Sequence, residues 1–186
     1  MLSAICCCLK SNQEGLLKVY FCGMIGSGKT TIGIPLAKDL GLDFYDLDRE
    51  MNDALGYSFH RLVRDKGWLA FRELEYSICK RFAEIDNSLI CLGGGTVRYE
   101  WNMDVMKGTG LMILLTASLD ELVRRVKIAD RPRVNTGTTL EEDVRTIWKN
   151  AKDKYYAAAD IVYPTDQKSL EAEIEELKKI ILDNTS

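Results

Sequence analysis

Short runs of apolar, β-branched and aromatic residues recur along the chain, separated by longer stretches with helical spacing. The run KVYFC at Lys18–Cys22 is typical of a strand that is buried on both faces. The same pattern predicts four further strands, over Phe44–Leu47, Ser88–Leu92, Leu111–Leu115 and Asp160–Tyr163. Helices are predicted between and after these strands, over Thr30–Leu40, Arg49–Ala54, Ser58–Lys66, Trp68–Glu84, Glu100–Met106, Leu119–Ile128, Leu140–Ala158 and Ser169–Leu182.

Strands that alternate with helices predict an α/β fold, in which helices cover both faces of a five-stranded parallel sheet. We find no internal repeat and no linker, so residues 17–186 are expected to form one domain behind a flexible leader of residues 1–16. Ligands of such sheets bind beyond the carboxyl ends of the strands. The polar and glycine-rich segments that follow the predicted strands are therefore the first candidates for a functional site.

Composition narrows the class of protein. The 186 residues are 46% hydrophobic and 28% charged, as in an ordinary globular domain, and the net charge of −3 argues against nucleic acid as a partner. No run reaches the roughly 18 apolar residues of a membrane span, and six cysteines without a C-x-x-C pair argue against a zinc site. We expect a cytoplasmic monomer without a membrane partner, although the adjacent cysteines Cys6–Cys8 leave acylation open.

The strongest motif follows the first strand. Gly23–Thr30, GMIGSGKT, fits the phosphate-loop pattern G-x-x-x-x-G-K-[ST] between a predicted strand and a predicted helix. Its backbone N–H groups would surround phosphate oxygens, Lys29 would reach the β- and γ-phosphates, and Thr30 would ligate Mg²⁺. GTPases, motor ATPases and metabolite kinases share the motif. The chain is short for a motor and lacks an N-K-x-D stretch, which favours a small phosphotransferase.

Two pairs of charged residues are candidates for binding an acceptor substrate. Asp46 and Asp48 are two apart in a predicted strand end, so both carboxylates are expected to face the same side. One is suited to supporting Mg²⁺ through water and the other to binding a hydroxyl group, unless Asp48 only caps the next helix. Arg72 and Glu75 are three apart on a predicted helix, where the glutamate would fix the arginine as a carboxylate clamp. The alternative is an ordinary surface ion pair.

A glycine run and a basic loop complete the candidates. Gly93–Gly95 follow the third predicted strand and permit close approach of a ligand to the backbone, unless they are only a flexible turn. The polar segment Asp130–Thr139 carries Arg131 and Arg133 and would close over the γ-phosphate, unless it is only a solvated loop.

Taken in order, these motifs resemble the shikimate kinase family. The resemblance runs from about Lys18 to about Leu182 through the phosphate loop, FYDLD, FRELE, LGGGTV, ADRPRV and YYAAAD. It implies a P-loop NTPase fold of the nucleoside-monophosphate-kinase type, three-layered, with strand order 2-3-1-4-5. It also implies transfer of the γ-phosphate of ATP to the 3-hydroxyl of shikimate, in the chorismate pathway of aromatic amino-acid biosynthesis, with Mg²⁺ as cofactor.

The resemblance also implies roles for individual residues. Lys29, Asp48 and Arg131 would be catalytic, Thr30 and, through water, Asp46 would hold Mg²⁺, and Arg124 would lie against the adenine ring. The nucleotide would be bound by Gly26, Ser27, Gly28, Lys29, Thr30, Thr31, Arg124 and Arg131. Shikimate would be bound by Asp48, Arg72, Gly93, Gly94 and Gly95. Residues 49–82 would form the substrate-binding subdomain and residues 129–139 the lid.

One departure from the family concerns the grip on the shikimate carboxylate. The family usually has a second arginine where this chain has Ala151, and Lys152 is the next candidate cation. Neighbouring helical residues point about 100° apart, so Lys152 can substitute only if the helix is rotated or its side chain reaches back. A kinase of the same fold for another hydroxylated metabolite, and a catalytically silent relative, therefore remain as alternatives.

Overall fold

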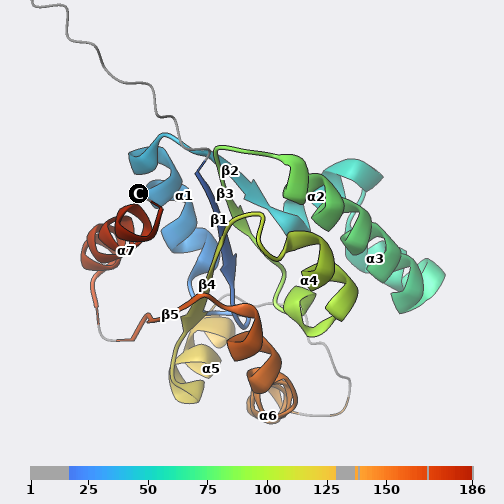
Figure 1. The fold of residues 1–186 in the computed structure, drawn as a ribbon. Coiled ribbons are helices and arrows are strands. Elements are labelled where there is room, and N and C mark those ends of the chain that lie inside the picture. The colour runs from blue at the N-terminus through green and yellow to red at the C-terminus, as the bar shows by residue number, and fades with distance from the viewer. Residues whose placement is uncertain (1–16, 129–136, 138, 167, 186) are drawn as a thin grey trace, which may run out of the picture.

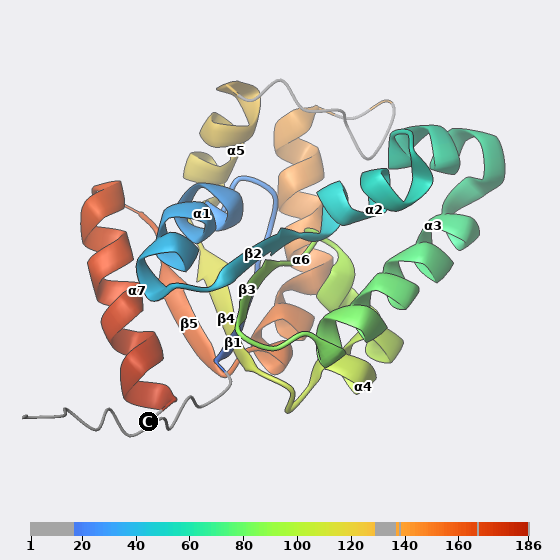
Figure 2. The same cartoon turned by 90° about the horizontal axis from the view of Figure 1, so that it is seen from above.

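The computed structural model describes residues 17–128, 137, 139–166 and 168–185. They form a five-stranded parallel sheet with strand order β2-β3-β1-β4-β5 and helices on both faces (Figure 1; Figure 2). The predicted fold class and strand order are confirmed. The leader of residues 1–16 and most of the predicted lid lie outside the described residues. In the described part of the chain, no helix is long and apolar enough to cross a lipid bilayer.

The elements follow each other in strict alternation only at the start and end of the chain. The strands are β1 Lys18–Cys22, β2 Asp43–Asp46, β3 Ser88–Cys91, β4 Leu111–Thr116 and β5 Ile161–Pro164. The helices are α1 Lys29–Leu40, α2 Leu47–Leu55, α3 Phe59–Glu84, the short 3₁₀ helix η1 Thr96–Arg98, α4 Glu100–Met106, α5 Leu119–Ile128, α6 Leu140–Ala158 and α7 Leu170–Asn184.

The position of β1 in the centre of the sheet explains the apolar run in its sequence. It pairs with β3 on one side and β4 on the other, and all five of its residues are buried. Val19 and Phe21 pack with α1 and α7, whereas Tyr20 and Cys22 face the opposite layer with α3, α4 and α6. A strand with both faces covered favours apolar residues at successive rather than alternate positions, which accounts for Val19–Cys22. The buried Lys18 at its start instead donates from Nζ to the carbonyl oxygen of Ala83 at 2.7 Å.

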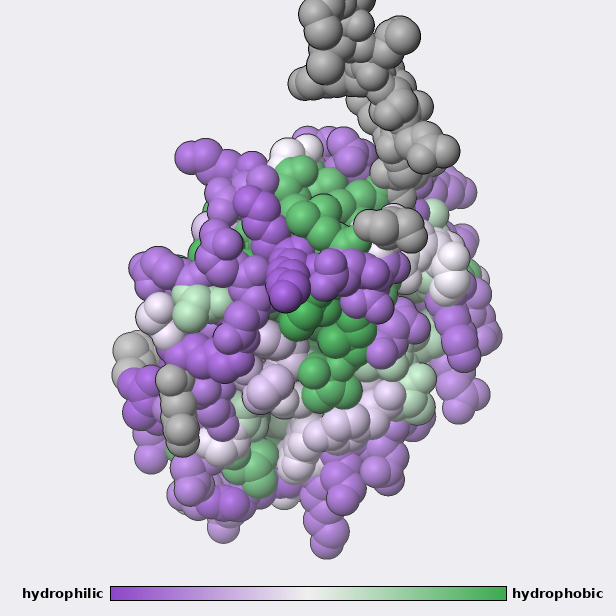
Figure 3. All heavy atoms as spheres, turned by 60° about the vertical axis from the view of Figure 1, so that its left-hand side comes forward, coloured by the Kyte–Doolittle hydropathy of each residue, from purple (hydrophilic) through white to green (hydrophobic). Residues whose placement is uncertain are grey.

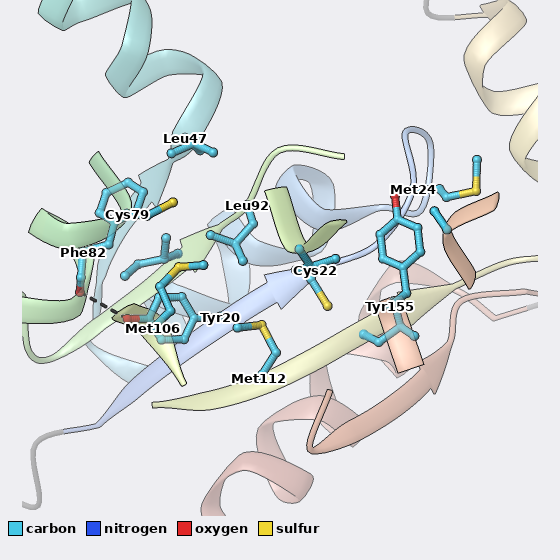
Figure 4. Close-up of a cluster of buried hydrophobic side chains, with 14 of the residues drawn as sticks. Tyr20, Cys22, Met24, Leu47, Cys79, Phe82, Leu92, Met106, Met112 and Tyr155 are labelled. Carbon is cyan, nitrogen blue, oxygen red and sulfur yellow. Dashed lines mark hydrogen bonds between the residues drawn. The ribbon is translucent and has the colours of Figure 1, made fainter. Parts of the chain in front are cut away.

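The layer on the α3 side is the larger of the two hydrophobic cores. Figure 4 shows Tyr20, Met106 and Phe82 side by side at one end of this layer, and Met24 beside Tyr155 at the other. The Tyr20 hydroxyl donates to the backbone carbonyl of Phe82 at 3.2 Å, which satisfies a buried polar group. The face turned forward in Figure 3 is mostly hydrophilic around a smaller hydrophobic area.

Three local features differ from the sequence-based expectation. The second strand ends at Asp46, so Asp48 lies in the first turn of α2 rather than in the strand. Two predicted helices form one element, α3, which is kinked at Gly67 (φ +81°) where we expected the break. The 3₁₀ helix η1 after the triple glycine was not predicted.

The packing of α1 on the sheet predicts a cost for adding one methyl group at Gly33. A Cβ atom there would lie 2.9 Å from Cε2 of Phe44 and 3.0 Å from Sγ of Cys91, closer than side chains pack. Although alanine favours a helix, overpacking outweighs this, and Gly33→Ala should lower the free energy of unfolding by about 1–2 kcal/mol in urea denaturation. The exposed Ile34→Ala serves as control. An unchanged or more stable Gly33→Ala would mean that α1 packs less closely than described.

Candidate active site

The candidate site lies where three neighbouring strands end. In the order β2-β3-β1, the last rung of pairing brings Asp46, Cys91 and Phe21 side by side. Because the strands are parallel, the segments that follow them leave the sheet at the same edge. The phosphate loop after β1, the aspartates at the end of β2 and the triple glycine after β3 are thereby brought together.

The phosphate loop has the geometry that its glycines predict. Gly23 has φ +138°, and a Cβ atom on it would lie 2.3 Å from the carbonyl oxygen of Leu115, so the position excludes any side chain. Gly28 adopts a left-handed conformation at the N-cap of α1. The loop therefore leads directly into a helix N-terminus, where the helix dipole favours an anion.

Lys29 lies across this loop. Its Nζ atom donates to the carbonyl oxygens of Gly23 at 2.9 Å and Met24 at 3.0 Å. Burial lowers the pKa of Lys29, and the nearby carboxylates of Asp48 and Asp46 oppose that shift. These two hydrogen bonds hold the ammonium group at the phosphate loop.

Asp46 connects the phosphate loop to α2. Its Oδ2 atom accepts from the Thr30 hydroxyl at 2.9 Å, and its Oδ1 atom accepts from the backbone N–H groups of Asp48 at 3.1 Å and Arg49 at 3.3 Å. Asp46, not Asp48, is thus the N-cap of α2. A hydroxyl and a carboxylate side by side at a phosphate loop fit Mg²⁺, which binds few protein oxygens and completes its coordination with phosphates and water.

Arg72 and Glu75 form a pair that is far more buried than a surface ion pair. Glu75 is only 1% exposed and accepts from Arg72 Nη1 at 2.7 Å. Its other donors are the Thr96 hydroxyl at 2.9 Å and the Asn102 amide at 3.2 Å. The interpretation as an ordinary surface pair is therefore wrong. Four groups from α3, η1 and α4 instead form one buried hydrogen-bonded network.

Aromatic rings hold the Arg72 guanidinium in place. Its Cζ atom lies 4.2 Å from the ring centre of Tyr99, 4.7 Å from that of Phe71 and 5.5 Å from that of Trp68. Cation–π contacts of this kind add to the ion pair with Glu75. The guanidinium is therefore fixed in orientation at the edge of the triple-glycine loop.

The triple glycine touches each part of the site in turn. A Cβ atom on Gly93 would lie 3.4 Å from Oδ1 of Asp48, one on Gly94 would lie 3.4 Å from the backbone nitrogen of Ile25, and one on Gly95 would lie 3.6 Å from Nη2 of Arg72. The three glycines thus lie against α2, the phosphate loop and α3.

Side chains of α6 donate hydrogen bonds to the triple-glycine loop and to η1. The Tyr155 hydroxyl donates to the carbonyl oxygen of Gly94, and Nζ of Lys154 donates to the carbonyl oxygen of Arg98 at 2.8 Å. Burial raises the pKa of Tyr155, against a smaller opposite effect of the Arg98 charge. Ala151 is buried one turn before Tyr155, whereas Lys152 is exposed.

The two arginines of α5 differ in their surroundings. Arg124 is 62% exposed and pairs with Glu121, whereas Arg125 reaches the carbonyl oxygen of Gly26 in the phosphate loop at 3.2 Å. The two arginines together lower the pKa of Glu121 to about 2. Sequence reasoning named Arg124 and missed Arg125, because adjacent arginines carry no signal of which one turns inward. Arg131 and Arg133 lie outside the described residues.

The buried network predicts a large cost for removing Glu75. Glu75→Ala would leave the Arg72 cation without its partner, and should lower the free energy of unfolding by about 3–5 kcal/mol, measured by urea denaturation. Glu73→Ala, an exposed position on the same helix, should change it by less than about 0.5 kcal/mol. Equal stabilities of the two variants would contradict the network.

Comparison with known proteins identifies one family over most of the chain. The sequence model of the family described as "Shikimate kinase" matches residues 25–182. Shikimate kinase of Chlorobium luteolum is 34% identical over 171 residues, covering 88% of this chain and 84% of that protein. Shikimate kinase of Clostridium botulinum is 31% identical over 167 residues, covering 90% and 98%.

Solved structures agree with the sequence relatives. Shikimate kinase from Acinetobacter baumannii in complex with shikimate superposes with a TM-score of 0.84 at 25% identity, covering 92% of this chain and 96% of that one. Shikimate kinase from Aquifex aeolicus gives a TM-score of 0.77 at 26% identity, covering 90% and 97%. The phosphate loop, the strand order and these relatives together show that the chain belongs to the shikimate kinase family of ATP-dependent phosphotransferases.

Proposed function

We propose that this protein transfers the γ-phosphate of ATP to the 3-hydroxyl group of shikimate. The observation that carries the proposal is the contact of the triple glycine with Asp48, the phosphate loop and Arg72. It supports a single site in which an acceptor with a hydroxyl at one end and a carboxylate at the other lies next to a nucleotide. The complex of the Acinetobacter baumannii relative with shikimate supports the same acceptor.

On the nucleotide side, residues Gly26–Thr31 would surround the phosphates and Lys29 would neutralise charge on the γ-phosphate. Thr30 would hold Mg²⁺ directly and Asp46 through water, as their mutual hydrogen bond of 2.9 Å supports. Mg²⁺ would supply electrostatic stabilisation between the β- and γ-phosphates. Arg124 would lie against the adenine ring, and Arg131 would close over the phosphates from the lid at 129–139.

On the acceptor side, Asp48 would bind the reacting hydroxyl and accept its proton. Arg72 would bind the shikimate carboxylate, since Glu75 and three aromatic rings fix its guanidinium. The backbone of Gly93–Gly95 would line the substrate between these two ends. Residues 49–82 would form the substrate-binding subdomain around it.

Phosphoryl transfer depends mainly on the positioning of the reacting groups. Phosphoryl transfer proceeds through a loose transition state, so alignment of the hydroxyl with the γ-phosphate and stabilisation of charge supply most of the rate. Asp48 orients the hydroxyl oxygen, and Lys29 stabilises the transferred group. We further propose a cytoplasmic monomer without nucleic-acid or membrane partners, in keeping with the net charge of −3.

A second cation for the shikimate carboxylate can be chosen from the burial and contacts of the residues near the triple glycine. Lys152 is exposed on α6, next to the buried Ala151. Arg98 is half-buried, follows Gly95 by three residues, and has its backbone carbonyl fixed by Lys154. We therefore propose Arg98, in place of the Lys152 that the sequence suggested, as the second cation beside Arg72. A buried alanine at 151 also favours, as the second candidate function, a kinase for a hydroxylated metabolite without that carboxylate.

Removing the Asp48 carboxylate tests the proposed reaction. The wild-type protein should phosphorylate shikimate with ATP and Mg²⁺, and Asp48→Asn should lower kcat by about 10²-fold or more, because the hydroxyl loses its base. Steady-state kinetics with ADP release as readout measures this. Asp53→Asn, an exposed position of the same helix, serves as control. No turnover of millimolar shikimate by the wild type would refute the proposal.

Paired substitutions decide between the two cations. Arg98→Ala should raise the KM for shikimate about 10- to 100-fold, because a charge-assisted hydrogen bond contributes roughly 1.5–3 kcal/mol, while the KM for ATP stays unchanged. Lys152→Ala should leave both within about twofold. The reverse result would return the role to Lys152, and no effect of either variant would favour an acceptor without the carboxylate.

A further inference from the structure

Two backbone carbonyl groups of the phosphate loop accept hydrogen bonds from side chains that lie outside the loop. Nη1 of Arg125 donates to the carbonyl oxygen of Gly26 at 3.2 Å. The Thr165 hydroxyl lies 3.2 Å from the next carbonyl oxygen, that of Ser27, and 3.1 Å from that of Thr116, and it shares its one proton between them. Arg125 and Thr165 come from α5 and from the turn after β5, about 100 and 140 residues away in the chain.

The two side chains act as one unit. Nη1 and Nη2 of Arg125 donate to the hydroxyl and carbonyl oxygens of Thr165 at 2.9 and 2.7 Å, and its Nε donates to Glu121 at 2.7 Å. Because an arginine is only a donor, the Thr165 hydroxyl must accept from it, which leaves the hydroxyl proton for the carbonyl oxygens of Ser27 and Thr116. Thr165 is 1% exposed and bonded to Thr116 through its backbone N–H at 2.8 Å, so it is a rigid support.

Because a peptide unit is planar, a hydrogen bond that fixes its carbonyl group also fixes the direction of the following N–H group. In a trans peptide unit the C=O and the following N–H point in opposite directions. Holding the Ser27 carbonyl outward therefore turns the N–H of Gly28 toward the inside of the loop. Within the described residues, this N–H donates to no protein acceptor, whereas the N–H of Ser27 donates to Met24 at 3.2 Å. The Gly28 N–H is thus oriented for an anion.

We propose that Arg125 and Thr165 are positioning residues of the phosphate loop. By holding the carbonyl groups of Gly26 and Ser27, they orient the peptide planes of the loop for phosphate binding. The inference rests on the proposed function only in that the loop binds nucleotide phosphates. The effect is expected in phosphate affinity and not in acceptor affinity. A residue that only supported the fold would change both.

Removal of the Thr165 hydroxyl tests the proposal most cleanly. Thr165→Val keeps the shape of the side chain and should weaken binding of ADP about tenfold by isothermal titration calorimetry, whereas Thr165→Ser should stay within about twofold. Binding of inorganic tripolyphosphate, which lacks the adenine base, should weaken by the same factor. Arg125→Lys should show the same pattern, with the affinity for shikimate unchanged in each variant.

Controls separate this role from charge, stability and the function itself. Lys127→Ala removes a cation from an exposed position of the same helix and should leave ADP affinity within about twofold. Equal ADP affinity of wild type and Thr165→Val would overturn the proposal, as would an equal loss of shikimate and ADP affinity in the variants. Failure of the wild type to phosphorylate shikimate, with the ADP pattern intact, would refute the proposed function and leave the positioning role supported.

Discussion

The structure depends on one constraint, the parallel order of β2, β3 and β1. Parallel strands must all leave the sheet at the same edge, and this order makes three of those exits neighbours. The phosphate loop, the Asp46–Asp48 segment and the triple glycine therefore meet although the first and last are about 70 residues apart. The buried central strand and the glycine-lined contacts are the local conditions that let the three exits approach so closely.

A second requirement is that the charged groups at this edge stay fixed. Glu75 is buried and fully engaged by Arg72, Thr96 and Asn102, so the arginine has little freedom. At the phosphate loop, Arg125 and Thr165 likewise hold the backbone carbonyls of Gly26 and Ser27 by hydrogen bonds. In both places a group that would meet substrate is held by groups that would not. Such support is how a site is preorganised for transfer of a phosphoryl group.

The sequence predicted the elements well and the supporting contacts poorly. Buried strands such as Lys18–Cys22 have a strong apolar signal, and the motif order implied the sheet order. Asp48 was expected in a strand because residue spacing does not show that Asp46 caps a helix at once. Thr96, Asn102 and Arg125 gave no signal, since their partners are distant in the chain and only the folded structure brings them together. The lid arginine Arg131 stays a prediction.

The central claim is that one edge of the sheet holds an acceptor hydroxyl and an acceptor carboxylate beside the phosphates. A crystal structure of the protein with Mg²⁺, ADP and shikimate tests this most directly. We predict that the 3-hydroxyl hydrogen-bonds to Asp48, that the carboxylate binds Arg72, and that the ring lies against Gly93–Gly95 with the β-phosphate on the phosphate loop. Shikimate bound elsewhere, or bound with its carboxylate turned away from Arg72, would contradict the account.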